Sequence, residues 1–316
     1  MLTLRVRFGQ MRALIILFVL WLLLASAALA QTPSPQFPEG YIGAENCRLC
    51  HENIGGAFDP HISIDRGESK RPQAKEWKGR TCEACHGPGK THMEKVEGKD
   101  IFIFGGSVRN PARMPASQVN ERCLKCHGQD ETHHRRVFGS HNRNQISCTE
   151  CHSIHQSVRR SLLAQDANEL CQQCHLSVRA EFMRPYRHKL QEGAMACVDC
   201  HNPHGELPPK QLRRVAANDI GCVKCHGDKR GPFPFEHAPV RLGNCTTCHE
   251  PHGSANPRML IRHEVRFLCL ECHTSNPSTI GVTPPAFHDL RSPRFRNCTM
   301  CHSKIHGSFV SRDLLR

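Results

Sequence analysis

The chain has 316 residues, of which 20 are cysteine, 23 are histidine and only 6% are aromatic. Glycine and proline are abundant and long aliphatic runs are scarce, which excludes an ordinary core of apolar side chains and requires some other apolar material in the interior. The formal net charge of +13 by itself favours a nucleic-acid or anionic-membrane partner.

The first thirty residues have the pattern of an export signal. Within residues 1–30, three arginines precede an apolar stretch at 13–24, and residues 28–30 read Ala-Leu-Ala, a small-x-small cleavage site. A retained membrane anchor is the alternative interpretation. Cleavage would leave residues 31–316 outside the cytoplasm, which argues against nucleic acid as a partner. No later stretch is long and apolar enough to be predicted as a membrane-spanning helix.

Every cysteine belongs to a C-x-x-C-H unit, a pattern typical of c-type haem attachment. The two thiols add across the haem vinyl groups, and the adjacent histidine ligates the iron from the proximal side. Structural zinc sites and thioredoxin-like motifs also use C-x-x-C, but neither requires a histidine next. We therefore predict ten covalently bound c-type haems. Their motifs are Cys47, Cys50 and His51; Cys82, Cys85 and His86; Cys123, Cys126 and His127; Cys148, Cys151 and His152; Cys171, Cys174 and His175; Cys197, Cys200 and His201; Cys222, Cys225 and His226; Cys245, Cys248 and His249; Cys269, Cys272 and His273; and Cys298, Cys301 and His302.

The motifs form an internal repeat of five two-haem modules. Each module contains a first motif, a lone histidine, a second motif and a trailing histidine. The modules cover about residues 47–92, 123–155, 171–204, 222–252 and 269–306, and their lone and trailing histidines are His61 and His92, His141 and His155, His188 and His204, His237 and His252, and His288 and His306. Ten such histidines match ten irons, which predicts bis-histidine ligation of every haem. Only His133, His134 and His263 are left over.

The trailing histidines stand too near their own motif to ligate the same iron. In CTECHSIH (148–155), His155 follows His152 by three residues, which span at most about 11 Å when extended. So short a segment cannot pass from one face of a haem to the other. We therefore expect His155, and likewise His204 and His252, to be distal ligands of neighbouring haems, so that consecutive haems lie close together. The sequence leaves open which distal histidine serves which iron.

The expected fold is a multihaem cytochrome c of mostly short α-helices and loops, with little regular secondary structure, built as an elongated array of ten haems. The last three intervals between module starts are 48, 51 and 47 residues, a regularity that predicts a quasi-one-dimensional molecule. The segments SQVNERCLKCH and DANELCQQCH have helical periodicity and begin with Ser117 and Asp166, which suit N-caps, so the module-opening motifs are predicted on short helices.

The linkers that follow the second motifs share a basic-leucine patch before the next module. The strongest strand signal is DIFIFGG at 100–106, for which we predict a small local hairpin, with an exposed docking patch as the alternative. The porphyrins are expected to supply most of the buried apolar surface, so that the chain without haem is largely unfolded. After loss of the signal, 39 basic and 29 acidic residues would remain, and the haem propionates would more than offset that excess.

A haem iron with histidine at both axial positions transfers electrons, whereas a catalytic haem usually keeps an open coordination position. The motifs and accompanying histidines therefore predict an electron carrier and not an enzyme. The ten motifs after a cleavable signal, with the trailers CHSIH, CHNPH and CHEPH, resemble the periplasmic decahaem cytochromes of the MtrA, MtoA and DmsE type across nearly the whole mature chain. Two alternatives remain open: a soluble periplasmic shuttle or donor to a terminal reductase, and a multihaem oxidoreductase with one open iron.

The resemblance implies an elongated haem wire, periplasmic and associated with the outer membrane, inserted into an outer-membrane β-barrel porin. The implied partners are that porin, periplasmic or inner-membrane c-type cytochromes, and either a surface multihaem cytochrome or extracellular iron or manganese minerals. The direction of electron flow stays open.

Overall fold

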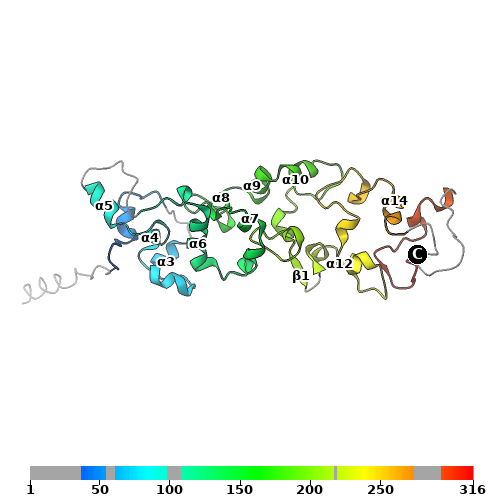
Figure 1. The fold of residues 1–316 in the computed structure, drawn as a ribbon, viewed down its shortest axis with the longest axis horizontal. Helices are drawn as coiled ribbons and strands as arrows, with labels where there is room; N and C mark the ends of the chain where they lie inside the picture. The colour runs from blue at the N-terminus through cyan, green and yellow to red at the C-terminus, as the bar shows by residue number, and fades with distance from the viewer. Residues whose placement is uncertain (1–36, 55–60, 98–107, 217–218, 274–292, 316) are drawn as a thin grey trace, which may run out of the picture.

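The structure, a computed structural model, describes residues 37–54, 61–97, 108–216, 219–273 and 293–315. The predicted signal at 1–30 and the predicted hairpin at 100–106 lie outside these residues. The described chain is elongated, and its colour runs in order from blue at one end to red at the other, so position along the sequence follows position along the molecule (Figure 1). This arrangement agrees with the predicted quasi-one-dimensional array.

Short helices and loops make up most of the described chain, as predicted. The α-helices are α2 (Ala44–Arg48), α3 (Ile62–Asp65), α4 (Thr81–His86), α5 (Lys90–Glu97), α6 (Ala116–His127), α7 (Ser140–Arg143), α8 (Cys148–Cys151), α9 (Ala167–Cys174), α10 (Leu176–Glu181), α11 (Cys197–Cys200), α12 (Gly227–Arg230), α13 (Ala238–Arg241) and α14 (Val265–Leu270). The 3-10 helices are η1 (Pro72–Trp77), η2 (Pro111–Arg113), η3 (Glu131–His133), η4 (Arg136–Phe138), η5 (Arg160–Leu162), η6 (Pro209–Gln211), η7 (Gly221–Lys224), η8 (Cys245–Thr247), η9 (Pro257–Met259), η11 (Pro293–Phe295) and η12 (Cys298–Met300). No helix among these is long and apolar enough to cross a membrane, a finding restricted to the described residues.

Sheet structure is confined, in the described ranges, to two antiparallel pairs of very short strands. Strand β1 (Arg214–Ala216) pairs with β2 (Asp219–Ile220), and β3 (Phe235–Glu236) pairs with β4 (Gly307–Ser308). The second pair joins the fourth predicted module to the end of the fifth. Strands of two or three residues are too short for an alternating pattern to be visible in the sequence.

All ten attachment motifs begin on a helical or 3-10 turn, not only the module-opening ones for which this was predicted. One turn places residues i, i+3 and i+4 on the same face, which is the spacing of the two cysteines and the histidine in C-x-x-C-H. The Asp166 side chain caps α9 by accepting from the Asn168 amide, as predicted. The Ser117 prediction is wrong: Pro115 is the N-cap of α6, whose first residue is Ala116, so Ser117 lies inside the first turn.

An asparagine joins the two motifs of a module in the second and third modules. The side-chain oxygen of Asn120, on α6, accepts from the Cys148 amide at 2.8 Å, and its nitrogen donates to the Ile146 carbonyl at 2.9 Å. Asn168, on α9, bonds in the same way to the Cys197 amide at 2.9 Å and the Met195 carbonyl at 3.0 Å. The second motif of each module therefore starts at a fixed place beside the first.

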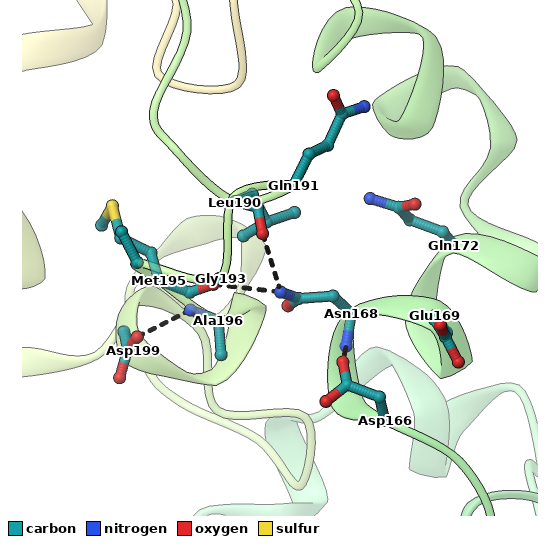
Figure 2. A pocket seen from close by; sticks show the side chains of 11 residues that line it. Asp166, Asn168, Glu169, Gln172, Leu190, Gln191, Gly193, Met195, Ala196 and Asp199 are labelled. Carbon is teal, nitrogen blue, oxygen red and sulfur yellow. Dashed lines mark hydrogen bonds between the residues drawn. The ribbon is translucent and has the colours of Figure 1, made fainter.

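Figure 2 shows the second of these joints, where a pocket opens around Asn168. Its lining contains no cysteine or histidine. The carboxylates of Asp166 and Asp199 accept from the backbone amides of Asn168 and Ala196, respectively, so both serve local structure. The pocket is therefore a structural joint between α9 and α11 and not an attachment site.

The apolar core is small. Among the described residues the buried apolar side chains are Ala44, Ala74, Val119, Phe182 and Leu190. A buried carboxylate supports the first module instead: Glu83, 2% exposed, accepts from the amides of Ile42, Gly43 and Gly89 at 2.8–3.0 Å. So few buried apolar groups agree with a fold whose interior is completed by something other than side chains.

Candidate haem sites

The first cysteines of the two motifs in each module contact one another. The hydrogen-bonded thiol pairs are Cys47 with Cys82, Cys123 with Cys148, Cys171 with Cys197, Cys222 with Cys245, and Cys269 with Cys298. In the second module this bond, donated to Cys148, lowers the pKa of the Cys148 thiol to about 7. The two attachment points of a module are therefore adjacent.

Successive modules are adjacent at their cysteines as well. Cys85 interacts electrostatically with Cys123, Cys151 with Cys171 and Cys174, Cys200 with Cys225, and Cys248 with Cys272. Together with the pairs inside the modules, these contacts link each motif to the next from the first to the tenth. The attachment points form one continuous line.

Nine motif histidines face a second histidine ring across a gap of nearly constant width. The ring centroids lie 5.9–6.5 Å apart in the pairs His51–His92, His86–His155, His127–His61, His152–His204, His175–His141, His201–His252, His226–His188, His249–His306 and His273–His237. We number the candidate sites 1 to 10 by the order of their motifs, so that site 6 is the His201–His252 pair. The predicted distal residue His288, which would complete site 10 with His302, lies outside the described residues.

The gap between the rings fits a haem iron. A metal–histidine nitrogen bond is about 2 Å long, and a ring centre lies roughly 1 Å behind its coordinating nitrogen, so two rings that share one metal have centres about 6 Å apart. The observed spacing matches this value at every measured pair. The residues therefore fit a haem held between two imidazoles, one from the attachment motif and one from the facing histidine.

The opposed rings come from different modules, with one exception. In the first four modules the lone histidine faces the first motif of the next module, as His61 faces His127. From the second module on, the trailing histidine faces the second motif of the preceding module, as His155 faces His86. Only His51 and His92 pair within one module among the described sites. Neighbouring modules thus interlock at two sites each, one in each direction.

The Nδ1 atoms of several haem-site rings are held by backbone acceptors, which leaves Nε2 of those rings available to a metal. His86, His152, His201, His249 and His302 bond through Nδ1 to the carbonyls of Arg109, Ser161, Lys210, Arg258 and Asp313 at 2.6–2.9 Å. On the opposite side, His141 and His188 bond to the carbonyls of Pro203 and Pro251 at 2.9 and 2.7 Å. Such bonds fix the tautomer and the orientation of a metal-binding imidazole.

The basic-leucine patch of the linkers forms the loop that supplies three of these carbonyls. Ser161, Lys210 and Arg258 each lie nine residues after the motif histidine that they contact, and each has a positive φ between 57° and 59°. A left-handed backbone is costly for such residues, so the surrounding structure must impose it. The return loop was visible in the sequence as a shared pattern, but its contact with the histidine was not.

Burial favours the neutral form of four of these rings, one motif histidine and three facing histidines, and the neutral form is the one that binds iron through a nitrogen lone pair. Burial lowers the pKa of His204 to about 4, and it lowers the pKa values of His201, His237 and His306 below their ordinary value. Desolvation is the largest cause in all four, because it penalises the charged imidazolium.

The three histidines outside the predicted set do not complete a site in the described chain. His133 stacks on His204 with ring centroids 4.0 Å apart, which is too close for an iron between them. His134 bonds to the Gln129 carbonyl at 2.9 Å, and His263 is exposed. Their exclusion from the predicted distal set agrees with this geometry.

Glycines that follow the trailing histidines allow one module to dock on the one before it. Gly205 (φ +135°) and Gly253 (φ +154°) succeed His204 and His252. A Cβ on Gly205 would lie 2.6 Å from the Arg135 carbonyl oxygen, and a Cβ on Gly253 would overlap the Glu181 carbonyl oxygen. Only glycine combines this backbone conformation with so close an approach. The recurring His-Gly dipeptide was a sequence signal for these docking contacts.

Gly253→Ala is expected to destabilise the holoprotein by about 1–3 kcal/mol, because the added methyl group forces the fourth module away from the third. Chemical denaturation followed by haem absorbance measures the change. Gly227→Ala is the matched control, since a Cβ at Gly227 meets nothing within 4 Å. Equal stability of the two variants would contradict the docking role of Gly253.

Comparison with known proteins places these sites in context. The doubled CXXCH motif family matches residues 141–180, 188–231 and 237–277. The chain is 36% identical over 293 residues to the multihaem cytochrome MtrA of Shewanella baltica (strain OS185), a match that covers 88% of this chain and 83% of that protein. The three segments matched by the family contain both rings of five of the nine opposed pairs: His152–His204, His175–His141, His201–His252, His226–His188 and His273–His237.

Proposed function

Because the chain belongs to the family of the multihaem cytochrome MtrA, we propose that it is a ten-haem electron conduit in which two histidines hold every iron. The chain is a multihaem c-type cytochrome, and its role is electron transfer as a carrier. The observation that supports the finer proposal is the series of nine opposed histidine pairs, spaced for an iron and arranged in motif order along an elongated molecule.

In this proposal the motif cysteines hold the porphyrins, the motif histidines are the proximal ligands, and the facing histidines are the distal ligands. His288 is the distal ligand of site 10, because it is the one predicted distal histidine that no other site uses. When bound, each haem supplies one-electron redox chemistry. Residues 1–30 are a cleaved signal, and residues 31–316 form a single decahaem domain of five modules.

The proposed location is the periplasm, in association with the outer membrane, with a β-barrel porin around the wire. An elongated line of sites suits a conduit, because its two ends present different haems to different partners. Periplasmic or inner-membrane c-type cytochromes would exchange electrons with one end. A surface multihaem cytochrome, or extracellular iron or manganese minerals, would do so with the other.

A mild-detergent pull-down of the tagged holoprotein from outer membranes tests the conduit. We expect a β-barrel protein to be recovered in stoichiometric amount. A monomeric holoprotein found free in the periplasmic fraction would overturn the conduit and favour a soluble shuttle. A second measurement separates carrier from enzyme, since a high-spin ferric signal in the oxidised holoprotein would reveal an open iron and contradict complete bis-histidine ligation.

A further inference from the structure

The acceptors on the histidine Nδ1 atoms are not all alike. Seven rings bond through Nδ1 to backbone carbonyls, as described above, and His237 bonds to the backbone of Ile305, but two other rings bond to carboxylates. His127 Nδ1 lies 2.9 Å from Asp130 Oδ2, and His252 Nδ1 lies 2.8 Å from Glu181 Oε2. A carboxylate brings a full negative charge to the back of the imidazole, whereas a carbonyl brings only a dipole.

The two carboxylates differ in how their charge is balanced. Asp130 pairs with the Arg71 guanidinium through two hydrogen bonds of 2.5 and 3.0 Å, and Arg71 holds the pKa of Asp130 at about 2. Glu181 has no lysine or arginine within ion-pair distance in the part of the chain that the structure describes, and its carboxylate contacts the His252 ring nitrogen. The charge of Glu181 therefore acts on His252 with less compensation.

The surroundings of His252 strengthen this contact. Phe182, which is 6% exposed, packs against the His252 ring at a centroid distance of 5.3 Å. An apolar neighbour excludes water from one side of the ring and reduces screening of the carboxylate. The opposite ring of site 6, His201, also has an acceptor, the Lys210 carbonyl at 2.8 Å. Both imidazoles of site 6 are therefore electron-rich.

Site 4, which has the same place in the preceding module, shows the opposite arrangement. Its proximal ring, His152, bonds to the Ser161 carbonyl at 2.7 Å, but the Nδ1 atom of the distal ring, His204, is buried without a hydrogen-bond partner. Nothing there draws the Nδ1 proton away from the ring. His204 is therefore the weaker electron donor to an iron, and His252 the stronger.

We propose that Glu181 is a positioning residue that lowers the reduction potential of site 6 relative to site 4 by acting through His252. A hydrogen bond from a ligating imidazole to a carboxylate raises the basicity of the ligand, and the added negative charge favours the ferric over the ferrous iron. The inference rests on the proposed haem ligation. Its consequence is a step in potential near the middle of the wire, set by one side chain.

Glu181→Gln in the full-length holoprotein tests the proposal. Glutamine keeps the shape and an acceptor oxygen but removes the charge, so one one-electron component of an equilibrium redox titration should move to higher potential. The other components should stay in place, and the oxidised spectrum should remain entirely low-spin. Optical absorbance and electron paramagnetic resonance follow the titration together.

Glu250→Gln is the matched control. Glu250 forms an ion pair with Arg184 at 2.8 Å at the same joint between the third and fourth modules, so its side chain contacts a guanidinium and not a haem-site ring. The role of Glu181 would be overturned if Glu181→Gln left the redox titration unchanged. It would also be overturned if Glu250→Gln shifted the same component by an equal amount. An open iron at site 6 in the unaltered protein would show instead that the proposed ligation has failed, and the inference with it.

Discussion

The chain made without haem attachment is expected to be largely unfolded, with a disordered far-ultraviolet circular dichroism spectrum and no cooperative thermal transition. The described residues bury five apolar side chains, two of them alanines; the other three contribute about 2 kcal/mol each, and the sum falls far short of the entropy cost of ordering a chain of this length. The histidine pairs support the same expectation, because their rings face each other at a spacing that fits an iron and make no direct contact. Folding and haem attachment should therefore be one process, as in small metal-dependent domains.

Circular dichroism and limited proteolysis of the chain produced in the cytoplasm without its signal would measure this effect. The exported holoprotein is the control, and it should resist the same protease treatment. A compact haem-free chain with a sharp unfolding transition would contradict the expectation, because it would require a core that the described residues do not contain.

Replacement of His155 by alanine is expected to open one iron and to disrupt transfer along the wire. The His155 ring faces His86 at 5.9 Å with an interplanar angle of 14°, so it is the proposed distal ligand of site 2. Axial ligands set haem potentials over a range of about 0.8 V, and loss of one histidine should shift site 2 by on the order of 0.1 V. For a one-electron couple, 59 mV corresponds to a tenfold change in equilibrium constant. The expected shift therefore changes the equilibrium ratio of reduced to oxidised haem at site 2 by roughly 50-fold.

The oxidised His155→Ala protein should show a high-spin ferric signal for one haem of ten, and added imidazole should restore the low-spin state. The end-to-end transfer rate, measured by stopped-flow absorbance between a donor and an acceptor, should fall and recover in parallel. His263→Ala is the control, because His263 is exposed and faces no motif histidine in the described chain. A fully low-spin His155→Ala protein would show that another group holds the iron of site 2.

Local sequence was sufficient to predict those features of the candidate sites that depend on residue spacing within one helical turn. Cys148, Cys151 and His152 are three positions of a single helical turn, so the attachment motif and its short helix could be predicted together. The three-residue separation of His152 and His155 likewise predicts that His155 serves a different site, and in the structure its ring faces His86. The five-module repeat and the elongated shape follow from the same local regularities.

The partner of each distal histidine could not be predicted, because it depends on how modules dock. His155 meets His86 and His252 meets His201, in each case across a module boundary, and at the second of these Gly253 permits close approach of the backbones. The acceptors of the Nδ1 hydrogen bonds could not be predicted either. The carbonyls of Ser161 and Lys210 reach their histidines through left-handed turns that the sequence does not favour.

The sequence by itself therefore determined where the attachment motifs lie, how many further histidines accompany them, and that the molecule is elongated, since these depend on residue type and short spacing. Tertiary structure alone decided which histidine faces which motif, and which rings meet a carboxylate, a carbonyl or no acceptor at all. The physical reason is that contacts between modules join residues far apart in the sequence, as between His252 and Glu181, which are 71 positions apart, and local pattern carries no information over such a separation.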